Sequence, residues 1–305
     1  MAAVILDGEK LAASIREELS REIEALRKSD SVPYLTAVQV GENPASKVYV
    51  NQQKKACNEI GIGYELKQVQ EDITEKSLID IIESLNNDKK VTGIILQMPV
   101  PKHIDARRVQ RRLSPLKDVE GMHPFNMGML VYGDPKIAPC TARGAIELLK
   151  SSGVSLKGKE VVVVGHSEIV GKPIALFLLQ SQLESATPTV CHIATRDLAS
   201  HTRRADIVIV AAGKPNLIKA DMLKDGAMVI DVGINRIPVL DAQGQPVVDE
   251  NGKKKMKTVG DVEFDKAKDK CSFISPVPGG VGPLTVAMLL RNCVECVKEQ
   301  KLEIV

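Results

Sequence analysis

Short apolar runs alternate with helical segments along this chain, and this alternation restricts the possible folds more than any other feature. Four apolar runs follow one another in the middle of the chain, at residues 159–164, 189–192, 206–211 and 227–232. Each is reached through a helical or loop segment, which is typical of the β-α-β-α-β order of a dinucleotide-binding domain. The middle of the chain therefore predicts a parallel sheet covered by helices.

The first third of the chain repeats the pattern on a smaller scale. We predict a helix over 8–28, a strand over 34–40, a helix over about 46–60, a strand and helix between 63 and 85, and a strand over 91–97. A chain of 305 residues exceeds a typical single domain, so we expect two domains.

Composition is consistent with this fold class and excludes some partners. Aromatic residues make up 3% and tryptophan is absent, so Val, Ile, Leu, Ala and Met must build the core. A net charge of +2 gives no reason to expect nucleic acid or an anionic membrane as a partner. Apolar runs stay far below the ~20 residues of a membrane helix, and the N-terminus lacks a signal-peptide pattern. We expect a cytoplasmic protein.

Six cysteines are spread over the chain and do not form a disulfide framework. Cys293 and Cys296 make a C-x-x-C within an apolar helical pattern, without a second ligand pair. We interpret them as helix thiols and expect no metal site. A basic cluster at 253–257 lies between two turn signals and is expected to be a solvated hairpin tip.

A rigid segment near the C-terminus contains three prolines and three glycines within residues 275–285. Proline restricts φ and glycine permits φ values that other residues avoid, so the segment specifies one backbone path. It follows an apolar run and precedes an apolar helix expected from 284 to about 299. A crossing loop that needs tight turns is the alternative to a ligand-binding wall.

The loop from Gly165 to Pro173 lies directly after a buried strand and at the start of a helix, where a phosphate would bind. It is not a G-x-G-x-x-G, because Ser167 occupies the second glycine position. No acid closes the second strand, where NAD-binding domains place one; the chain instead runs from His192 to Arg196. Arg196 is a candidate partner for a 2′-phosphate or a solvated residue, so NADP and NAD both stay open.

Polar side chains also mark the first half of the chain. Tyr49 and Gln53 are spaced i, i+4 and share one helix face. Gln97 ends a strand before a proline, and residues 117–121 form an acidic turn. Such positions at the carboxyl edge of a parallel sheet form the usual active-site crevice.

At these residues the chain resembles the methylenetetrahydrofolate dehydrogenase/methenyltetrahydrofolate cyclohydrolase (FolD) family over essentially its whole length. The matching stretches are Asn43-Pro44-Ala45-Ser46 with Tyr49-Val50, Gln97-Met98-Pro99, Lys117-Asp118-Val119, Pro139-Cys140-Thr141, Gly165-His166-Ser167 with Ile169-Val170-Gly171-Lys172-Pro173, Asp231-Val232-Gly233-Ile234-Asn235, Val259-Gly260-Asp261-Val262, and Pro276 to Thr285.

The resemblance implies a small α/β catalytic domain, 1–147 with 284–305, and a Rossmann-type NAD(P) domain, 148–283, with the last helix returning to the first domain. It implies a folate cleft between the domains, a tetrahydrofolate substrate and a homodimer. NADP is slightly favoured over NAD as cofactor.

The resemblance also assigns the candidate site residues. Those for catalysis are Tyr49, Gln53, Gln97 and Glu120. Those for substrate binding are Tyr49, Gln97, Met98, Pro99, Glu120, Val277, Pro278, Gly279 and Gly280. Those for cofactor binding are Cys140, Thr141, Gly165, His166, Ser167, Ile169, Val170, Gly171, Pro173, His192, Arg196, Ala212, Gly213, Gly233, Ile234 and Asn235.

Two positions depart from the family pattern. Gln53 stands where the family has a lysine associated with the cyclohydrolase step, and Glu120 stands where it has aspartate. An amide cannot titrate, so Gln53 cannot act as acid or base. We therefore expect an NAD(P)-dependent methylenetetrahydrofolate dehydrogenase whose cyclohydrolase activity is weak or absent. In the alternative, the enzyme is fully bifunctional, with Lys54 or a bound water replacing the lysine.

Two further alternatives stay open at this stage. One is a Rossmann dehydrogenase for a non-folate substrate, as in shikimate-type enzymes. The other is a folate- or nucleotide-binding regulator without turnover, against which the intact Tyr49, Gln97 and cofactor loop count.

Overall fold

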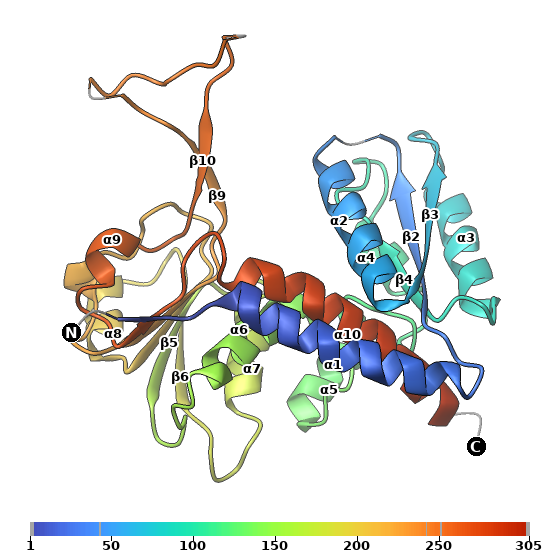
Figure 1. The fold of residues 1–305 in the computed structure, drawn as a ribbon, viewed down its shortest axis with the longest axis horizontal. Helices are drawn as coiled ribbons and strands as arrows, with labels where there is room; N and C mark the ends of the chain where they lie inside the picture. Colours follow the sequence, from blue (N-terminus) through green and yellow to red (C-terminus); the bar gives the residue numbers. More distant parts are fainter. Residues whose placement is uncertain (1–2, 43, 242, 251, 303–305) are drawn as a thin grey trace. The chain divides into compact units, whose positions relative to one another are not determined.

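The computed structural model describes residues 3–42, 44–241, 243–250 and 252–302, and the chain divides into two compact units. Unit 1 combines Met1–Leu11 with Thr141–Leu284, and unit 2 combines Ala12–Cys140 with Thr285–Val305 (Figure 1). This differs from the predicted division, which placed the N-terminal residues and 141–147 with the catalytic domain. Strand pairing is the reason, because β1 (Val4–Ile5) joins β11 (Phe273–Ile274) in the sheet of unit 1.

Unit 1 is built on a six-stranded sheet in which every paired neighbour is parallel. The order is β1, β11, β8 (Met228–Asp231), β7 (Ile207–Val210), β5 (Glu160–Val164) and β6 (Thr187–Cys191). Every residue of β7 and β8 is buried, as expected for central strands that helices cover on both faces. The predicted α/β class with a Rossmann-type sheet is confirmed.

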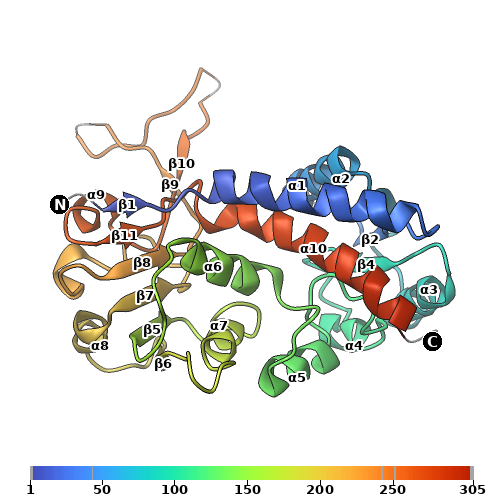
Figure 2. The ribbon, with the colours of Figure 1, turned by 60° about the horizontal axis from the view of Figure 1, so that its bottom comes forward.

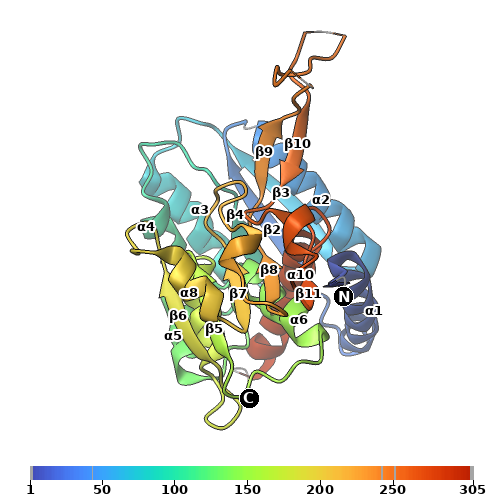
Figure 3. The ribbon, with the colours of Figure 1, turned by 90° about the vertical axis from the view of Figure 1, so that its left-hand side faces the viewer.

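The connections of unit 1 are short helices and one hairpin. The helices are α6 (Cys140–Ser151), α7 (Gly171–Leu178), α8 (Leu198–Arg204), the 3₁₀ turn η1 (Ala220–Met222) and α9 (Phe264–Ala267). The hairpin of β9 (Asn235–Pro238) and β10 (Met256–Val259) is antiparallel and extends away from the six-stranded sheet (Figure 3). The basic cluster lies in this hairpin, as predicted.

Unit 2 contains a three-stranded parallel sheet in the order β3 (Gly63–Val69), β2 (Tyr34–Val40) and β4 (Gly93–Leu96). Its shorter helices are α2 (Pro44–Ile60), α3 (Glu75–Asn87), α4 (Ala106–Gln110) and α5 (Pro124–Tyr132). Val38, Leu78, Ile82 and Ile94 are fully buried in the core. Strands at the predicted positions thus form a sheet because their aliphatic side chains are packed against α3 and α4.

Two long helices, α1 (Gly8–Arg27) and α10 (Val281–Leu302), each begin in unit 1 and continue in unit 2. Within unit 2 they lie side by side (Figure 2). Helix α10 starts three residues earlier than predicted, so its first turn includes Pro283. Proline is tolerated there because a first-turn N–H has no intrahelical acceptor in any case.

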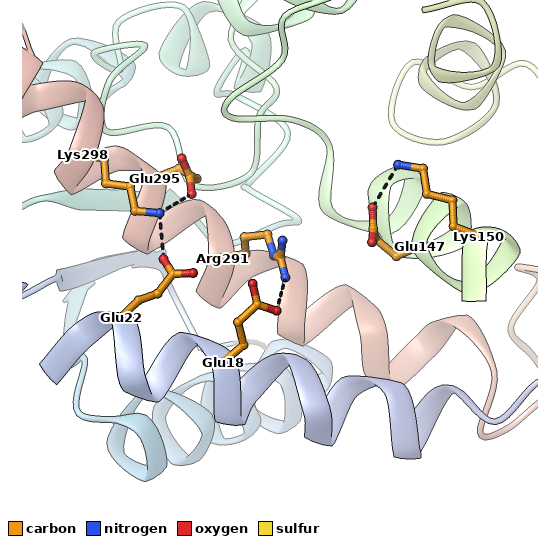
Figure 4. A network of polar contacts seen from close by, with 7 residues as sticks. All are labelled: Glu18, Glu22, Glu147, Lys150, Arg291, Glu295 and Lys298. Atoms are coloured by element: carbon orange, nitrogen blue, oxygen red, sulfur yellow. Dashed lines mark hydrogen bonds and ion pairs between the residues drawn. The ribbon is translucent and has the colours of Figure 1, made fainter. Parts of the chain in front are cut away.

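Polar contacts hold α10 to α1 and to the rest of unit 2. Arg291 pairs with Glu18 at an N–O distance of 3.2 Å, and Lys298 pairs with Glu22 at 2.7 Å. A separate pair on α6 joins Lys150 to Glu147 at 3.4 Å. Figure 4 draws these contacts as dashed lines. These pairs are partly exposed to solvent, and surface ion pairs contribute about 0–1 kcal/mol each.

A buried amide anchors α10 more firmly than the ion pairs. The side chain of Asn292 is fully buried, and its Nδ2 donates to the carbonyls of Val119 and Ala138, both at 2.8 Å. Nε2 of Gln300 donates to the carbonyls of Thr92 and Leu116 at 2.8 and 3.0 Å. The C-terminal helix therefore packs within unit 2, which confirms the prediction that it returns to the first domain.

The two cysteines of the C-x-x-C motif are free thiols in the core. Cys293 and Cys296 are buried on α10, and burial raises the pKa of each well above its ordinary value. Within the part of the chain that the structure describes, no three His, Cys, Asp or Glu side chains are grouped as a metal site would need. None of the described helices combines the length and the hydropathy of a membrane-spanning segment.

Candidate active site

Unit 2 brings together two of the predicted catalytic residues. Helix α2 begins just after β2 and carries Tyr49, whose side chain is 59% exposed, and Gln53 one turn later. Gln97 follows β4, and its backbone N–H continues the sheet by donating to the carbonyl of Val38 at 2.8 Å. The buried Nε2 of Gln97 donates to Oε1 of Gln53 at 2.7 Å.

This amide pair positions groups but cannot move protons. Neither Gln53 nor Gln97 titrates, so the pair supplies hydrogen-bond donors and acceptors alone. The neighbouring Lys54 and Lys55 are exposed, and Lys55 forms an ion pair with Glu59 at 3.8 Å. Because adjacent helix residues differ by ~100° around the axis, these lysines do not share the face of Gln53.

The turn that carries Glu120 extends the sheet of unit 2 beside β4. Ile94 donates its N–H to the carbonyl of Lys117 at 2.7 Å, and Ile94 and Asp118 form a parallel bridge. Since Asp118 is opposite Ile94, Glu120 lies two residues further toward the edge at which Gln97 follows β4. The turn therefore places Glu120 at the same carboxyl edge as the amide pair.

Two buried charged groups hold this turn, and the sequence analysis did not assign them a role. Nζ of Lys117 donates to the carbonyls of Leu85, Asn86 and Asp88, at 3.1, 2.7 and 2.8 Å, at the end of α3. These contacts satisfy carbonyls that a helix C-terminus leaves open.

The carboxylate of Asp118 accepts from the N–H of His123 at 2.6 Å and from Nδ2 of Asn126 at 3.0 Å. Burial raises the pKa of Asp118, and the hydrogen bonds from His123 and Asn126 act against this rise. Lys117 and Asp118 both lie in the motif that carried the family resemblance, which was the available signal for their importance.

Glu120 is the titratable group at this edge. Burial, together with the negative charge of Asp118, raises its pKa to about 8. Among the described residues, none forms a hydrogen bond or ion pair with the Glu120 carboxyl. Glu120 is therefore held at an edge of the sheet with a carboxyl that has no hydrogen-bond partner among the described residues and a pKa raised toward neutral pH.

The remaining predicted substrate residues of unit 2 follow Gln97 directly. Met98 is 46% exposed, and the Met98–Pro99 peptide bond is cis. The predicted motif residue Asn43 lies outside the described residues.

The Pro/Gly segment belongs to unit 1 and is packed against the start of α1. Ser275 is fully buried, and its Oγ accepts from the N–H of Asp231 at 2.7 Å. The N–H of Gly8 donates to the carbonyl of Gly279 at 2.9 Å, and a Cβ on Gly8 would lie 1.7 Å from the carbonyl oxygen of Gly280. Gly279 has φ +100°, and the Val277–Pro278 bond is cis. The segment is thus closely packed against the start of α1, and the single rigid backbone path stays a prediction.

Two glycines shape the turn after β5 in unit 1. Gly165 has φ +121°, and a Cβ there would lie 2.2 Å from the carbonyl oxygen of Ala211. A Cβ on Gly171 would lie 2.0 Å from the carbonyl oxygen of Gly165. Ser167, at the second glycine position, uses its Oγ to accept from the N–H of Val170 at 3.2 Å. Only glycine fits at the first and last positions of this turn.

The same turn presents donors suited to a phosphate. Within the described chain, the backbone N–H groups of His166, Ser167 and Ile169 have no acceptor, and α7 begins directly afterwards. Open N–H groups beside the positive end of a helix dipole bind anions. These residues fit the pyrophosphate of a dinucleotide.

The end of β6 is followed by His192 and Arg196 instead of an acid, and His166 follows the neighbouring strand β5. The rings of His166 and His192 stack with centroids 4.8 Å apart, and Arg196 is exposed. No carboxylate follows β6 at the position that binds the ribose hydroxyls of NAD. The residues that follow β6 are therefore compatible with a 2′-phosphate on the cofactor ribose, as in NADP.

Other predicted cofactor residues are tied to two aspartates that the sequence analysis did not list as site residues. The N–H groups of Ala212 and Gly213 donate to Asp261, as does the side chain of Asn235, and the N–H of Gly233 donates to Asp231. Ile234 is 60% exposed. Both aspartates lie inside motifs that matched the family, so the signal for them was present.

Burial also affects the charge of this aspartate pair. Burial first, and the charge of Asp261 to a smaller extent, raise the pKa of Asp231 to about 7. Three backbone N–H donors, from Asp261, Val262 and Gly233, act in the opposite direction.

Cys140 and Thr141 stand at the boundary of the two units and at the start of α6. The Sγ of Cys140 donates to the carbonyl of Val119 at 3.4 Å and accepts from Nδ2 of Asn292 at 3.4 Å. The structure therefore places the Cys140 thiol among residues of unit 2.

A parallel sheet with a glycine-shaped turn before a helix and open N–H donors defines unit 1 as a Rossmann-type dinucleotide-binding unit. Comparison with known proteins narrows this class. Residues 6–120 match the model of the tetrahydrofolate dehydrogenase/cyclohydrolase catalytic domain, and residues 139–301 match the model of the NAD(P)-binding domain of the same family.

Relatives match over nearly the whole chain. The chain is 46% identical over 298 residues to the bifunctional protein FolD of Bacillus subtilis, covering 98% of this chain and 99% of that protein. It is 48% identical over 300 residues to the bifunctional protein FolD of Acetivibrio thermocellus, with coverage of 98% and 99%. This protein therefore belongs to the tetrahydrofolate dehydrogenase/cyclohydrolase family, as the resemblance predicted.

Solved structures agree with the family assignment. The bifunctional FolD enzyme of Campylobacter jejuni has a TM-score of 0.88 at 43% identity, covering 98% of this chain and 100% of that one. The dehydrogenase-cyclohydrolase of Trypanosoma brucei, solved with NADP and an inhibitor, has a TM-score of 0.87 at 37% identity, covering 99% of both chains. The chain is thus a methylenetetrahydrofolate dehydrogenase of this family. The homodimer and the cytoplasmic location stay predictions.

Proposed function

We propose that this protein catalyses both reactions: the NAD(P)-dependent oxidation of 5,10-methylenetetrahydrofolate and the hydrolysis of the 5,10-methenyl product. The close relatives are named bifunctional. They favour the alternative from the sequence analysis over the expectation of weak or absent cyclohydrolase activity. Glu120, which the sequence led us to expect would weaken the cyclohydrolase step, supports the fully bifunctional alternative in the structure.

The dehydrogenase step depends mainly on positioning. A bound dinucleotide supplies the acceptor for the hydride that leaves the methylene carbon, and the adjacent folate nitrogen stabilises the resulting cation. The protein has to hold the folate ring in place, for which the exposed ring of Tyr49 and the buried amide of Gln97 are suited. The turn of Gly165 and Gly171 is suited to hold the pyrophosphate.

The cyclohydrolase step requires proton transfer. Water adds to the cationic methenyl carbon and loses a proton, which gives a neutral carbinolamine. One C–N bond then breaks as the nitrogen gains a proton and the hydroxyl proton leaves to solvent, so that a formyl group forms and one proton is released overall. The Gln53–Gln97 pair orients these groups through its hydrogen bond at 2.7 Å, but it cannot exchange protons. Glu120 takes up the proton as carboxylate and returns it as carboxylic acid. The observation that carries the proposal is a carboxyl at the carboxyl edge of the sheet, unpaired among the described residues, with a pKa raised to about 8.

A paired assay tests the proposed function. We expect the purified protein to oxidise methylenetetrahydrofolate with NADP or NAD and to hydrolyse methenyltetrahydrofolate at a rate within about tenfold of the oxidation. Dehydrogenase activity with hydrolysis no faster than in buffer would contradict the bifunctional proposal. Absence of both activities would contradict the proposed function as a whole.

We propose NADP as the preferred cofactor, because β6 ends without a carboxylate and Arg196 is exposed beyond it. Replacing Arg196 by alanine should lower kcat/KM for NADP about 10-fold or more and leave kcat/KM for NAD within twofold, since a lost charge-assisted contact costs roughly 1.5–3 kcal/mol. The matched control is Arg203→Ala, which removes an exposed arginine whose Nε donates to the carbonyl of Asp221 at 2.8 Å. An equal loss with both cofactors would contradict a role for Arg196 in recognising the 2′-phosphate.

A further inference from the structure

Two buried carboxylates lie behind the residues of unit 1 that are expected to face the dinucleotide. Asp231 ends β8 and is 3% exposed, and Asp261 follows β10 and is fully buried. Neither was assigned a role by the sequence analysis. Their surroundings within unit 1 show what each one holds.

The carboxylate of Asp261 joins the segments that follow β7 and β8. Its Oδ2 accepts from the N–H groups of Ala212 and Gly213, at 2.7 and 2.8 Å. Its Oδ1 accepts from Nδ2 of Asn235 at 2.8 Å. Each of these three residues is a predicted cofactor residue, and the two N–H groups are already engaged. Ala212 and Gly213 therefore shape the site and do not offer these donors to a ligand.

The carboxylate of Asp231 holds Asp261 itself in place. Its Oδ1 accepts from the N–H groups of Gly233 and Asp261, at 2.9 and 3.0 Å, and its Oδ2 accepts from the N–H of Val262 at 2.8 Å. Because a buried donor or acceptor that loses its partner costs roughly 1–3 kcal/mol, the two carboxylates and their donors constrain one another.

Close packing excludes a ligand from the space between the carboxylates and the backbone. A Cβ on Gly233 would lie 2.2 Å from Oδ1 of Asp261, and a Cβ on Gly260 would lie 1.9 Å from Oδ2 of Asp231. Glycine is required at both positions because the backbone touches the acids directly. The aspartates therefore act on the protein's own backbone and not as ligands of a bound group.

The constraint reaches the phosphate-binding turn through one peptide group. Asp261 accepts the N–H of Ala212, and the carbonyl at the other end of that peptide belongs to Ala211. A Cβ on Gly165 would lie 2.2 Å from this same carbonyl oxygen. In a trans peptide the N–H and C=O point in opposite directions. An acceptor that fixes the N–H of Ala212 therefore also fixes the Ala211 carbonyl oxygen, against which Gly165 is packed.

We infer that Asp261, held by Asp231, is a positioning residue for the dinucleotide, since it fixes the backbone after β7 and β8 and, through the Ala211 carbonyl, the turn at Gly165. This inference rests on the proposed dinucleotide binding. It adds two acids that contact neither substrate nor cofactor but determine how tightly the cofactor is held.

The test compares two variants of Asp261 with a matched variant elsewhere on the same sheet. Asp261→Ala removes all three acceptor contacts. Asp261→Asn keeps one oxygen for Ala212 and Gly213 and turns an NH₂ group toward Asn235, whose amide can rotate to accept it. Asp206→Asn is the control. Asp206 precedes β7 at the opposite edge and accepts from the N–H of Glu160 at 3.0 Å and from Nζ of Lys224 at 2.7 Å.

Titration calorimetry with NADP and NAD, together with steady-state kinetics, provides the readouts. We expect Asp261→Ala to raise Kd and KM for the dinucleotide at least about tenfold and to leave KM for the folate substrate within twofold. For Asp261→Asn we expect a loss of roughly threefold, and for Asp206→Asn no change in Kd. A role in general stability alone would change both KM values together.

Three results would overturn the inference. The first is a folded Asp261→Ala variant that binds the dinucleotide as the wild type does. The second result applies if Asp261→Ala does not fold: a dinucleotide affinity of Asp261→Asn equal to that of the wild type would then overturn the inference. The third is a wild-type protein that binds neither dinucleotide, which would also remove the proposed function. Binding by the wild type with unaltered binding by the variants would reject the inference alone.

Discussion

Replacing Glu120 by glutamine is expected to lower the cyclohydrolase kcat about 100-fold or more, since positioned acid–base groups contribute about 10²–10⁴-fold. Glutamine keeps the size of the side chain and one acceptor oxygen but cannot exchange a proton. The dehydrogenase kcat should fall less than about tenfold, because that step needs alignment more than proton transfer. Both rates are measured on the same protein preparation.

The pH profile shows whether Glu120→Gln loses activity because proton transfer is lost or because the site is structurally disturbed. With a pKa of about 8, the basic form of Glu120 accumulates as the pH rises, so the wild-type hydrolysis rate should rise toward pH 8 and then level off. The Glu120→Gln rate should stay flat over this range. Retention of half the wild-type hydrolysis rate, or an unchanged pH profile in the variant, would show that another group moves the proton.

Stability provides an independent control for the same variant. The folded-state pKa of Glu120 lies above its ordinary value of 4.5, so the folded state binds its proton more tightly than the unfolded state. The contribution to stability is therefore present below pH 4.5 and is lost as the pH rises through about 8. Glu120→Gln should remove this pH-dependent loss of stability, so the lower hydrolysis rate of the variant near pH 8 cannot be attributed to unfolding.

The alternative proton carrier can be supplied by mutation. Gln53→Lys in the wild-type background should change hydrolysis little, because Glu120 already exchanges the proton. In the Glu120→Gln background the same change places an ammonium group at the position of the amide that contacts Gln97. Partial recovery of hydrolysis there would confirm that the missing function is proton transfer.

Replacing Gly8 by alanine is expected to have the second large effect. The new Cβ would lie 1.7 Å from the carbonyl oxygen of Gly280 and 2.9 Å from that of Gly279. Gly280 has little room to retreat, because a Cβ on it would already lie 2.6 Å from the carbonyl oxygen of Pro276. The Pro/Gly segment must shift as a whole, at a cost of about 2 kcal/mol or more in the free energy of unfolding.

The functional effect should follow the same displacement. If Val277 to Gly280 contact the folate, as the resemblance implies, KM for methylenetetrahydrofolate should rise about tenfold or more in Gly8→Ala. Thermal unfolding and steady-state kinetics measure the two consequences. Wild-type stability together with a wild-type KM would show that the segment tolerates displacement and does not contact the substrate.

The same substitution elsewhere provides the control. Gly128 lies within α5, and a Cβ there would meet no atom within 4 Å. Gly128→Ala should therefore be neutral or should stabilise the protein by about 0.4–1 kcal/mol, through the lower entropy of the unfolded chain. The contrast between the two alanines isolates the clash at Gly280.

Much of the fold was predictable because its signals are local. The apolar runs at 159–164, 206–211 and 227–232 became β5, β7 and β8 because a buried parallel strand needs a continuous aliphatic run. The turn at Gly165 and the amides at Gln53 and Gln97 were recognisable for the same reason. Each depends on residues close together in sequence or on the edge of the sheet at which a strand ends.

The strands β1 and β11 could not be predicted from local sequence signals. Each has two residues, too few for periodicity, and they pair across most of the chain. The division into compact units therefore differs from the predicted boundaries. Long-range pairing of short strands depends on the sheet already formed by their neighbours, which no local pattern encodes.

The sequence by itself determined the α/β class, the family and the dinucleotide turn, because these depend on residue type and spacing. The roles proposed for Glu120 and Asp261 rest on the tertiary structure alone. The raised pKa of Glu120 comes from burial and from Asp118, and the hold of Asp261 on Ala212 and Gly213 joins residues 48 or more positions apart. Desolvation and long-range hydrogen bonds exist only once the chain has folded, so these properties follow from packing and not from pattern.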